Sequence, residues 1–155
     1  EEAFAGMNRR SRDNSRRPMQ WNHTKNAGFS TAGQTWLKVN PNYQDINADN
    51  QQTEDSILSY YKKMISLRTT APYKNVLTYG TFIPITGKEP TIIAYERKIE
   101  GQSVLVLINF SDQPVVYPVD PLFTQVVLNN YQDAIAISAN KIQLQPYHSL
   151  VLANF

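Results

Sequence analysis

The sequence predicts a mainly β fold, in which an antiparallel β-sandwich follows a loop-rich segment and a single helix. Three observations support this prediction. Residues 75–155 contain short β-branched and aromatic runs separated by turn residues, residues 53–70 have the apolar period of a helix, and residues 11–52 have neither pattern. A length of 155 residues with 41% hydrophobic residues is enough for a sizeable core.

The first residues, 1–6, read as helix, and the chain starts with Glu1. We therefore expect it to be a piece of a longer polypeptide. Residues 11–52 are rich in Asn, Gln, Gly, Pro, Ser and Thr, which predicts a long loop with short ordered pieces. Compact domains rarely contain such a connection unless it forms a functional site or packs against something else. The part of the protein against which residues 11–52 pack could lie outside this sequence.

A helix is predicted over residues 53–70. Thr53 offers a capping hydroxyl, and the two acids after it suit the positive end of the helix dipole. Pro72 makes continuation past Ala71 unfavourable. Apolar residues recur at the spacing of one buried helix face, together with a tyrosine that is also expected to face the core: Ile57, Leu58, Tyr60, Tyr61, Met64 and Ile65.

From residue 75 onward the pattern is that of strands. Glu100 and Gly101 supply the turn of the clearest hairpin. Seven or eight short strands at this spacing predict an antiparallel sandwich or barrel. The expected strands are residues 76–79, 81–85, 91–98, 103–110, 115–119, 124–128, either 135–138 or 141–144, and 149–153.

Composition excludes several classes of function. With no cysteine, a disulfide scaffold, a thiol nucleophile and a thiolate metal site are ruled out. The only two histidines, His23 and His148, provide too few ligands for a metal site, so we expect neither a metal nor a cofactor. We assign no chemical role to either histidine. No apolar run approaches the length of about 18 residues that a membrane span needs. The net charge of +2 is uneven, with +3 over residues 1–25.

The densest local signal is residues 11–21, which read Ser-Arg-Asp-Asn-Ser-Arg-Arg-Pro-Met-Gln-Trp. Arg12 and Arg16 carry planar guanidinium groups that suit carboxylates or paired hydroxyls, and Trp21 offers a flat apolar face. Arginine, amide and tryptophan together are typical of a sugar site. A solvated basic turn is the alternative, and composition alone favours it.

The same run resembles the Arg-Asp-Asn-x-Arg-Thr-Pro-Met-Gln-Trp signature of the α-amylase superfamily, in the branch of oligo-1,6-glucosidases, dextran glucosidases, trehalose-6-phosphate hydrolases and sucrose isomerases. Three later blocks continue the pattern in order: Asn-Ala-Gly-Phe at 26–29, Trp-Leu-Lys-Val-Asn-Pro-Asn-Tyr at 36–43 and Ile-Asn at 46–47. The resemblance is strong over residues 11–68 and generic over 75–155.

This resemblance implies a retaining glycoside hydrolase with a (β/α)8 barrel followed by a β-sandwich. Residues 1–74 would be the end of the barrel, with the loop after its eighth strand and its last helix, and residues 75–155 the C-terminal domain. Retaining hydrolysis needs two carboxyl groups about 5–5.5 Å apart. None of the acids of the loop and helix cap matches a catalytic motif of the family: Asp13, Asp45, Asp49, Glu54 and Asp55. We therefore expect no catalytic residue here and no activity from this chain alone.

By the family pattern, Arg16 matches the arginine that helps hold glucose in the −1 subsite, and Arg12 is the second candidate for substrate binding. Arg12 could instead pair with Asp13 or with a barrel carboxylate. Arg17 departs from the family, which normally has threonine there. Trp21 is expected to anchor the loop more than to stack on a sugar.

The implied parent protein is a cytoplasmic α-glucosidase that hydrolyses α-1,6 or related bonds in small oligosaccharides. A stand-alone carbohydrate-binding β-sandwich is the main alternative. Nucleic-acid binding is disfavoured because the arginine cluster has only two aromatic neighbours, Phe4 and Trp21. We expect no nucleic-acid or membrane partner. We expect self-association through the apolar face of the helix at 53–70, which in the parent protein would cover a barrel.

Overall fold

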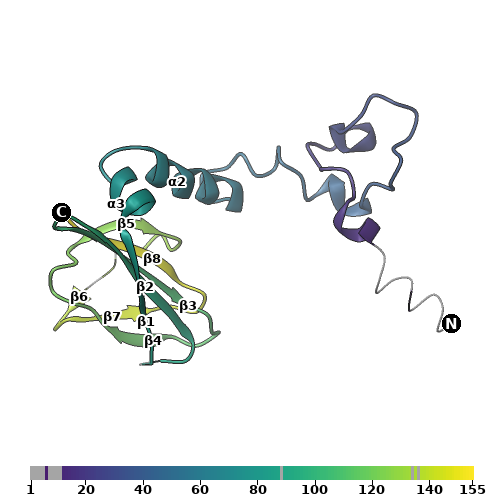
Figure 1. Cartoon of the computed structure of the whole chain (residues 1–155). Coiled ribbons are helices and arrows are strands. Elements are labelled where there is room, and N and C mark those ends of the chain that lie inside the picture. Colours follow the sequence, from purple (N-terminus) through teal and green to yellow (C-terminus); the bar gives the residue numbers. More distant parts are fainter. Residues whose placement is uncertain (1–5, 7–11, 88, 134, 136) are drawn as a thin grey trace. The chain divides into compact units, whose positions relative to one another are not determined.

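The computed structural model of the chain describes residues 6, 12–87, 89–133, 135 and 137–155 (Figure 1). Of the helix expected over residues 1–6, only Gly6 falls among them. The chain divides into two units, residues 1–60 and residues 61–155, which we call unit 1 and unit 2. The boundary at residue 74 expected for the end of the barrel stays a prediction.

Unit 1 is the predicted long loop with short ordered pieces. Between residues 12 and 56, its regular elements are three single-turn 3-10 helices joined by bends and turns: η1 (Arg12–Ser15), η2 (Lys25–Gly28) and η3 (Pro41–Gln44). Short polar side chains that hydrogen-bond the nearby backbone explain why such a sequence settles into turns.

Helix α2 (Ile57–Thr69) confirms the predicted helix but begins later than expected. Ser56, not Thr53, caps it, because the Ser59 N–H donates to Ser56 Oγ at 3.0 Å. The Ser56 hydroxyl in turn donates to the Thr53 carbonyl at 2.9 Å. The expectation of a buried apolar face is wrong for the described structure, since no residue of α2 is buried and four large apolar side chains are exposed: Ile57, Tyr61, Met64 and Ile65.

Helix α3 (Lys74–Tyr79) replaces the strand predicted at residues 76–79, which is a correction. A short apolar run does not distinguish a buried strand from a buried helical turn. Packing decides here, because Val76 is completely buried against Val104, Val106 and Ala153 on one face of a β-sheet. Gly80 ends the helix where a Cβ would lie 2.4 Å from the Val76 carbonyl oxygen.

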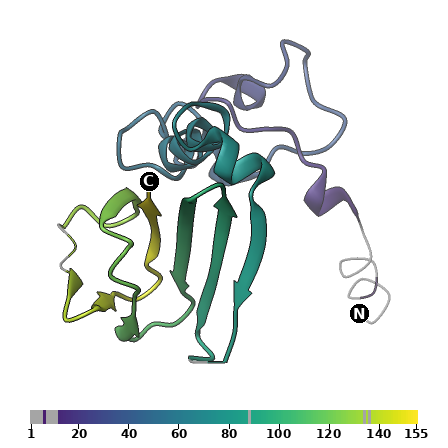
Figure 2. The same cartoon turned by 60° about the vertical axis from the view of Figure 1, so that its left-hand side comes forward.

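Unit 2 contains the predicted antiparallel sandwich. The larger sheet has the order β1-β2-β3-β8-β5 and the smaller has the order β4-β7-β6. Figure 2 shows β1, β2 and β3 side by side. The strand bounds are β1 (Thr81–Ile85), β2 (Ile92–Ile99), β3 (Gln102–Asn109), β4 (Val115–Pro118), β5 (Gln125–Asn129), β6 (Ile137–Ser138), β7 (Lys141–Leu144) and β8 (Ser149–Asn154). Both runs left open by the sequence, 135–138 and 141–144, therefore contain strands.

The core lies between the two sheets, with a second cluster where α3 covers the outer face of the larger sheet. Strand β3 is covered on both faces, which explains five consecutive buried residues at 103–107. The predicted turn between β2 and β3 is present, with positive φ at Glu100 and Gly101, as a two-residue hairpin loop requires. Prolines occupy the outermost strands β1 and β4, at Pro84 and Pro118.

Candidate functional site

The two arginines predicted to bind substrate lie at either end of one helical turn in unit 1. Arg12 begins η1 and Arg16 follows its last residue. The turn is closed by the Ser15 hydroxyl, which donates to the Arg12 carbonyl at 2.9 Å, and by the Arg16 N–H, which donates to the Asp13 carbonyl at 3.1 Å. The sequence block therefore places both side chains on one short, ordered element.

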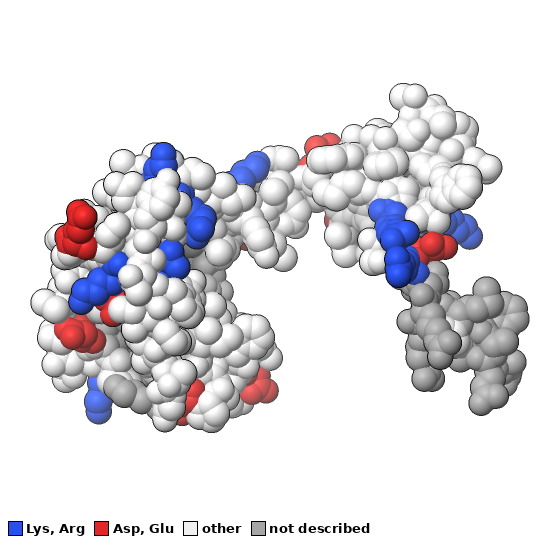
Figure 3. Space-filling model, in the orientation of Figure 1, with Lys and Arg blue, Asp and Glu red and all other residues white. Residues whose placement is uncertain are grey.

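Both guanidinium groups are exposed. Among residues 12–60, neither Arg12 nor Arg16 has a side-chain hydrogen bond or an ion pair, and Arg12 does not pair with Asp13. Figure 3 shows basic side chains grouped on the surface at this turn. The donors of Arg12 and Arg16 are therefore available for a ligand or for carboxylates outside this sequence.

Residues 12–16, which we call the arginine turn, are anchored on their C-terminal side by hydrogen bonds between residues 20–21 and residues 46–49, which we call the clasp. Pro18 is buried, and Gln20 then makes two contacts to the segment after η3: its side-chain Nε2 donates to the Ile46 carbonyl, and its own carbonyl accepts from the Ala48 N–H at 2.9 Å. The Trp21 carbonyl accepts from the Asp49 N–H at 3.0 Å. Trp21 is 50% exposed, so the backbone more than the indole ring holds this position.

The block at 26–29 forms a left-handed turn that the sequence did not reveal. Asn26, Ala27 and Gly28 have φ values of 55°, 56° and 67°. The Ala27 carbonyl accepts both the Trp21 N–H at 2.9 Å and the Asn22 N–H at 3.2 Å. Asparagine and glycine adopt this backbone readily, whereas alanine does so only under constraint. Ala27 is completely buried, which is consistent with such a constraint.

Asn47, from the Ile-Asn block, is a buried structural residue that sequence reasoning left without a role. It is 4% exposed. Its Nδ2 donates to the Tyr43 carbonyl at 2.9 Å, and its Oδ1 accepts from the Asn50 N–H at 2.9 Å. The blocks singled out in the sequence therefore contain two kinds of residue in unit 1: the exposed arginines Arg12 and Arg16, and the buried, turn-forming Asn47.

Trp36 is 98% exposed beside an open groove of about 440 Å³. Asn26, Gln34 and Lys38 line the same groove. The sequence flagged this tryptophan only as part of a matching block.

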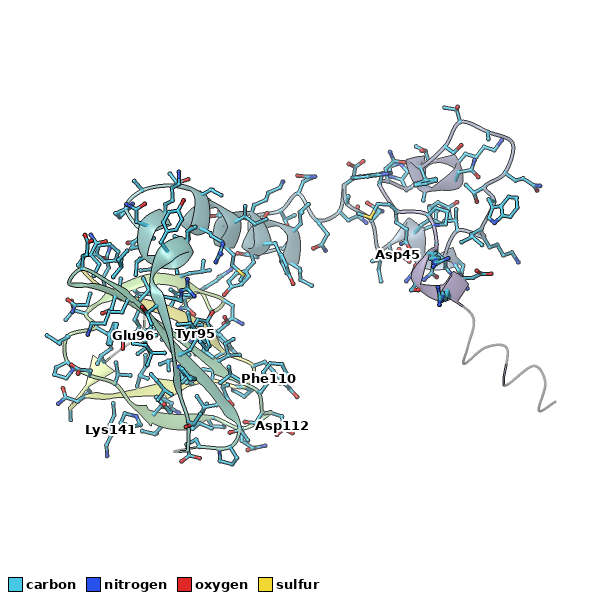
Figure 4. All side chains as sticks on the ribbon, viewed as in Figure 1. Asp45, Tyr95, Glu96, Phe110, Asp112 and Lys141 are labelled. Atoms are coloured by element: carbon cyan, nitrogen blue, oxygen red, sulfur yellow. The ribbon has the colours of Figure 1, made fainter. Side chains whose placement is uncertain are left out.

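The acidic side chains of the described residues do not gather into a metal site, since no group of three His, Asp or Glu side chains is placed to hold an ion. Asp45, labelled in Figure 4, is exposed just after η3. His148 is buried in unit 2, and His23 is exposed in unit 1. No helix within the described ranges is long and apolar enough to cross a membrane.

Comparisons with known proteins cover nearly the whole chain. A family model described as "Alpha amylase, catalytic domain" matches residues 1–80, and one described as "Alpha-amylase SusG C-terminal domain" matches residues 92–151. An oligo-1,6-glucosidase of Bacillus cereus is 37% identical over 92% of this chain and 25% of its own length. The trehalose-6-phosphate hydrolase of Escherichia coli is 36% identical over 86% of this chain and 24% of its own length.

A solved structure of isomaltulose synthase from Klebsiella sp. LX3 gives a TM-score of 0.81 at 40% identity. It covers 92% of this chain and 26% of that protein's chain. The chain thus spans about a quarter of the length of the curated relatives it matches.

Proposed function

Because this chain belongs to the α-amylase family, we propose that it is the C-terminal part of a retaining α-glucosidase, comprising the end of the catalytic barrel and the β-sandwich domain. Relatives named oligo-1,6-glucosidase and glucan 1,6-alpha-glucosidase support α-1,6 or related bonds in small oligosaccharides as its substrates. The match of residues 1–80 to a catalytic-domain model favours this proposal over a stand-alone carbohydrate-binding sandwich.

The proposal rests on the arginine turn, residues 12–16, which the hydrogen bonds between residues 20–21 and residues 46–49 hold in place. Arg16, with Arg12 as a second ligand, bonds the hydroxyls of the glucose ring in the −1 subsite and fixes the ring for attack. The exposure of both guanidinium groups, without partners in residues 12–60, supports this role. Nucleophilic attack and protonation of the leaving oxygen come from carboxylates outside this sequence.

The test compares the 155-residue chain with the full-length gene product on a nitrophenyl α-glucoside and on isomaltose. We expect hydrolysis by the full-length enzyme only, with retention of the anomeric configuration seen by NMR. Hydrolysis by the 155-residue chain would contradict the placement of the catalytic groups. A full-length enzyme that released the inverted anomer would contradict the proposed reaction.

Two further proposals accompany this one. The parent enzyme is cytoplasmic, as the absence of cysteine and the handling of small imported sugars by similar enzymes suggest. The 155-residue chain self-associates through the exposed apolar face of α2.

A further inference from the structure

The larger sheet of unit 2 carries apolar side chains on both of its faces. The inner face forms the core between the two sheets, and the outer face carries the second cluster, under α3. An antiparallel sheet with one face in water normally has polar side chains on that face. In strands β1, β2, β3 and β8, whose residues are all described, the one charged side chain at an outer-face position is that of Arg97. The outer face therefore has the composition of a covered surface.

Helix α3 covers only one end of this outer face. A helix of six residues is about 9 Å long, whereas the eight residues of β3 span about 27 Å. Burial falls off along the strands accordingly. On β3, Val104 and Val106 are buried but Ile108 is only partly buried, and on β8, Ala153 is buried but Val151 is only partly buried. The face is therefore open on the side away from α3.

The open part of the outer face is a contiguous apolar surface, which we call the outer patch: Phe82, Ile93, Tyr95, Ile108 and Val151. These residues come from four strands that neighbour each other in the sheet. Ile93 lies opposite Ile108, and the rings of Phe82 and Tyr95 have centroids 5.1 Å apart. Phe82 is 53% exposed and Ile93 is 48% exposed. An exposed apolar surface of this kind marks an interaction site.

The smaller sheet has a different outer face. On β7, Lys141 and Gln143 are exposed and alternate with the buried Ile142 and Leu144. Lys141 is labelled in Figure 4. This alternation is typical of a sheet with one face in the core and the other in water. Of the two outer faces, the larger sheet's is therefore the one built to be covered.

Helix α3 indicates what covers it. The match to a catalytic-domain model extends to residue 80 and so includes α3. This helix is nevertheless fixed to the sandwich, because Val76 packs on the outer face and Arg97 Nη2 donates to the Thr78 carbonyl at 3.2 Å. The last element of the catalytic-domain match is thus already docked at one end of the outer patch. The chain spans only about a quarter of the length of its relatives, and the outside of a (β/α)8 barrel is a ring of helices.

We propose that the outer patch is the surface on which the catalytic barrel of the parent protein packs, a proposal that rests on the proposed function for the presence of that barrel. Apolar side chains of the barrel's outer helices cover the patch and continue the contact that α3 begins. The smaller sheet then faces away from the barrel, toward solvent.

The test is the reactivity of an introduced thiol toward a maleimide, with Ile93→Cys made in the 155-residue chain and in the full-length gene product. The 155-residue chain has no cysteine of its own, and mass spectrometry of the labelled peptide identifies the site in both proteins. We expect labelling to be slower by about tenfold or more in the full-length protein, because a covered thiol reacts only when the contact opens. Val116→Cys is the matched control, since Val116 is 57% exposed on the smaller sheet and should react equally in both proteins.

A charged substitution provides a second measurement. Ile93→Lys should lower the thermal midpoint of the full-length protein and leave that of the 155-residue chain unchanged, because the side chain is half exposed in the chain alone. Val116→Lys should change neither midpoint.

Equal thiol reactivity of Ile93→Cys in the two proteins would overturn the proposal. Protection within the 155-residue chain that grew with its concentration would assign the outer patch to a second copy and would overturn it as well. A full-length protein that protected this thiol without hydrolysing α-glucosides would contradict only the proposed function.

Discussion

The side chains of His148 and Asn129 are joined by a hydrogen bond of 2.7 Å between Nε2 of the imidazole and Oδ1 of the amide. Nδ1 of His148 accepts the Gln145 N–H at 3.2 Å, so the ring proton resides on Nε2 and the imidazole is neutral. Tyr131 packs on the ring with a centroid separation of 4.9 Å. This arrangement ties the end of β5 to the turn that precedes β8.

The stability of unit 2 should depend on the protonation of His148. Burial lowers the pKa of this histidine below its ordinary value of 6.5. The unfolded chain then binds a proton at a higher pH than the folded chain, so the contribution is complete above about pH 6.5 and declines as the pH falls below it. Urea unfolding at pH 7.5, 6.5 and 5.5 should show this loss.

The variant His148→Gln should flatten that pH dependence, and His23→Gln, at an exposed position of unit 1, should keep it. An unchanged slope in His148→Gln would assign the pH dependence to other groups.

Removing Arg16 from the full-length enzyme should impair catalysis more than folding. We expect Arg16→Ala to reduce kcat/KM on isomaltose by ~10²-fold, because a substrate-positioning contact is lost, with only a small change in thermal midpoint. Lys25→Ala is the control for removing a cation from the same unit. Near-wild-type kinetics in Arg16→Ala would remove this residue from the substrate site.

Arg12→Ala separates two roles for the second arginine. A ligand of the sugar should show reduced kcat/KM at unchanged stability, whereas a partner of a barrel carboxylate should show reduced stability as well. Steady-state kinetics and thermal unfolding on the same preparation distinguish these results.

Asn109 should be a large single contributor to the stability of the sandwich. It is completely buried, and its Nδ2 donates to the Gln113 and Gln145 carbonyls at 2.7 and 2.9 Å. Its Oδ1 accepts from both the N–H and the hydroxyl of Ser111, at 3.1 and 2.8 Å. Asn109→Ala removes the four hydrogen bonds made by this buried amide and should cost about 2–4 kcal/mol of unfolding free energy.

Chemical denaturation measures that cost. Gln113→Ala is the control, because the Gln113 side chain is exposed, and the change should be within about 0.5 kcal/mol. Equal effects of the two substitutions would contradict the structural role assigned to the Asn109 amide.

Self-association through α2 should be visible by sedimentation velocity. Ile57, Tyr61, Met64 and Ile65 are all exposed, and burying them against a second copy removes apolar surface from water. Ile65→Glu should shift the chain toward monomer, and Ser66→Glu, with the same charge on a neighbouring position, should not. A wild-type chain that stays monomeric at high concentration would contradict this prediction.

Limited proteolysis should cut within residues 11–52 and leave residues 75–155 intact. Unit 1 is made of turns and single-turn helices, whereas the sheets and their core hold unit 2 together. Mass spectrometry of the products locates the cuts. A protected core that ended near residue 70 would contradict a domain boundary at residue 74.

The strands of unit 2 were predictable because their apolar alternation and turn residues are local signals. The turn at Glu100-Gly101 is an example, since its positive φ values follow from its sequence and from the two-residue loop. The segment 76–79 was not predictable in the same way, because its conformation is decided by the packing of Val76 on the outer face of the larger sheet. Local conformational propensity carries no information about that tertiary contact.

The candidate site was only partly predictable for a related reason. The spacing of Arg12 and Arg16 was visible in the sequence, but the clasp between Gln20 and residues 46–48 joins segments more than 25 residues apart.

Pro84 and Pro118 limit strand pairing between copies of this sandwich in a concentrated solution. Each stands in the outermost strand at one side of its sheet, where an unpaired row of N–H groups would otherwise invite a strand from another molecule. Proline has no N–H to offer, so it interrupts that row. Edge-to-edge growth into fibrils is therefore discouraged at β1 and β4. In the self-association proposed above, copies of the chain would meet at helix α2, where contacts between side chains can dissociate again.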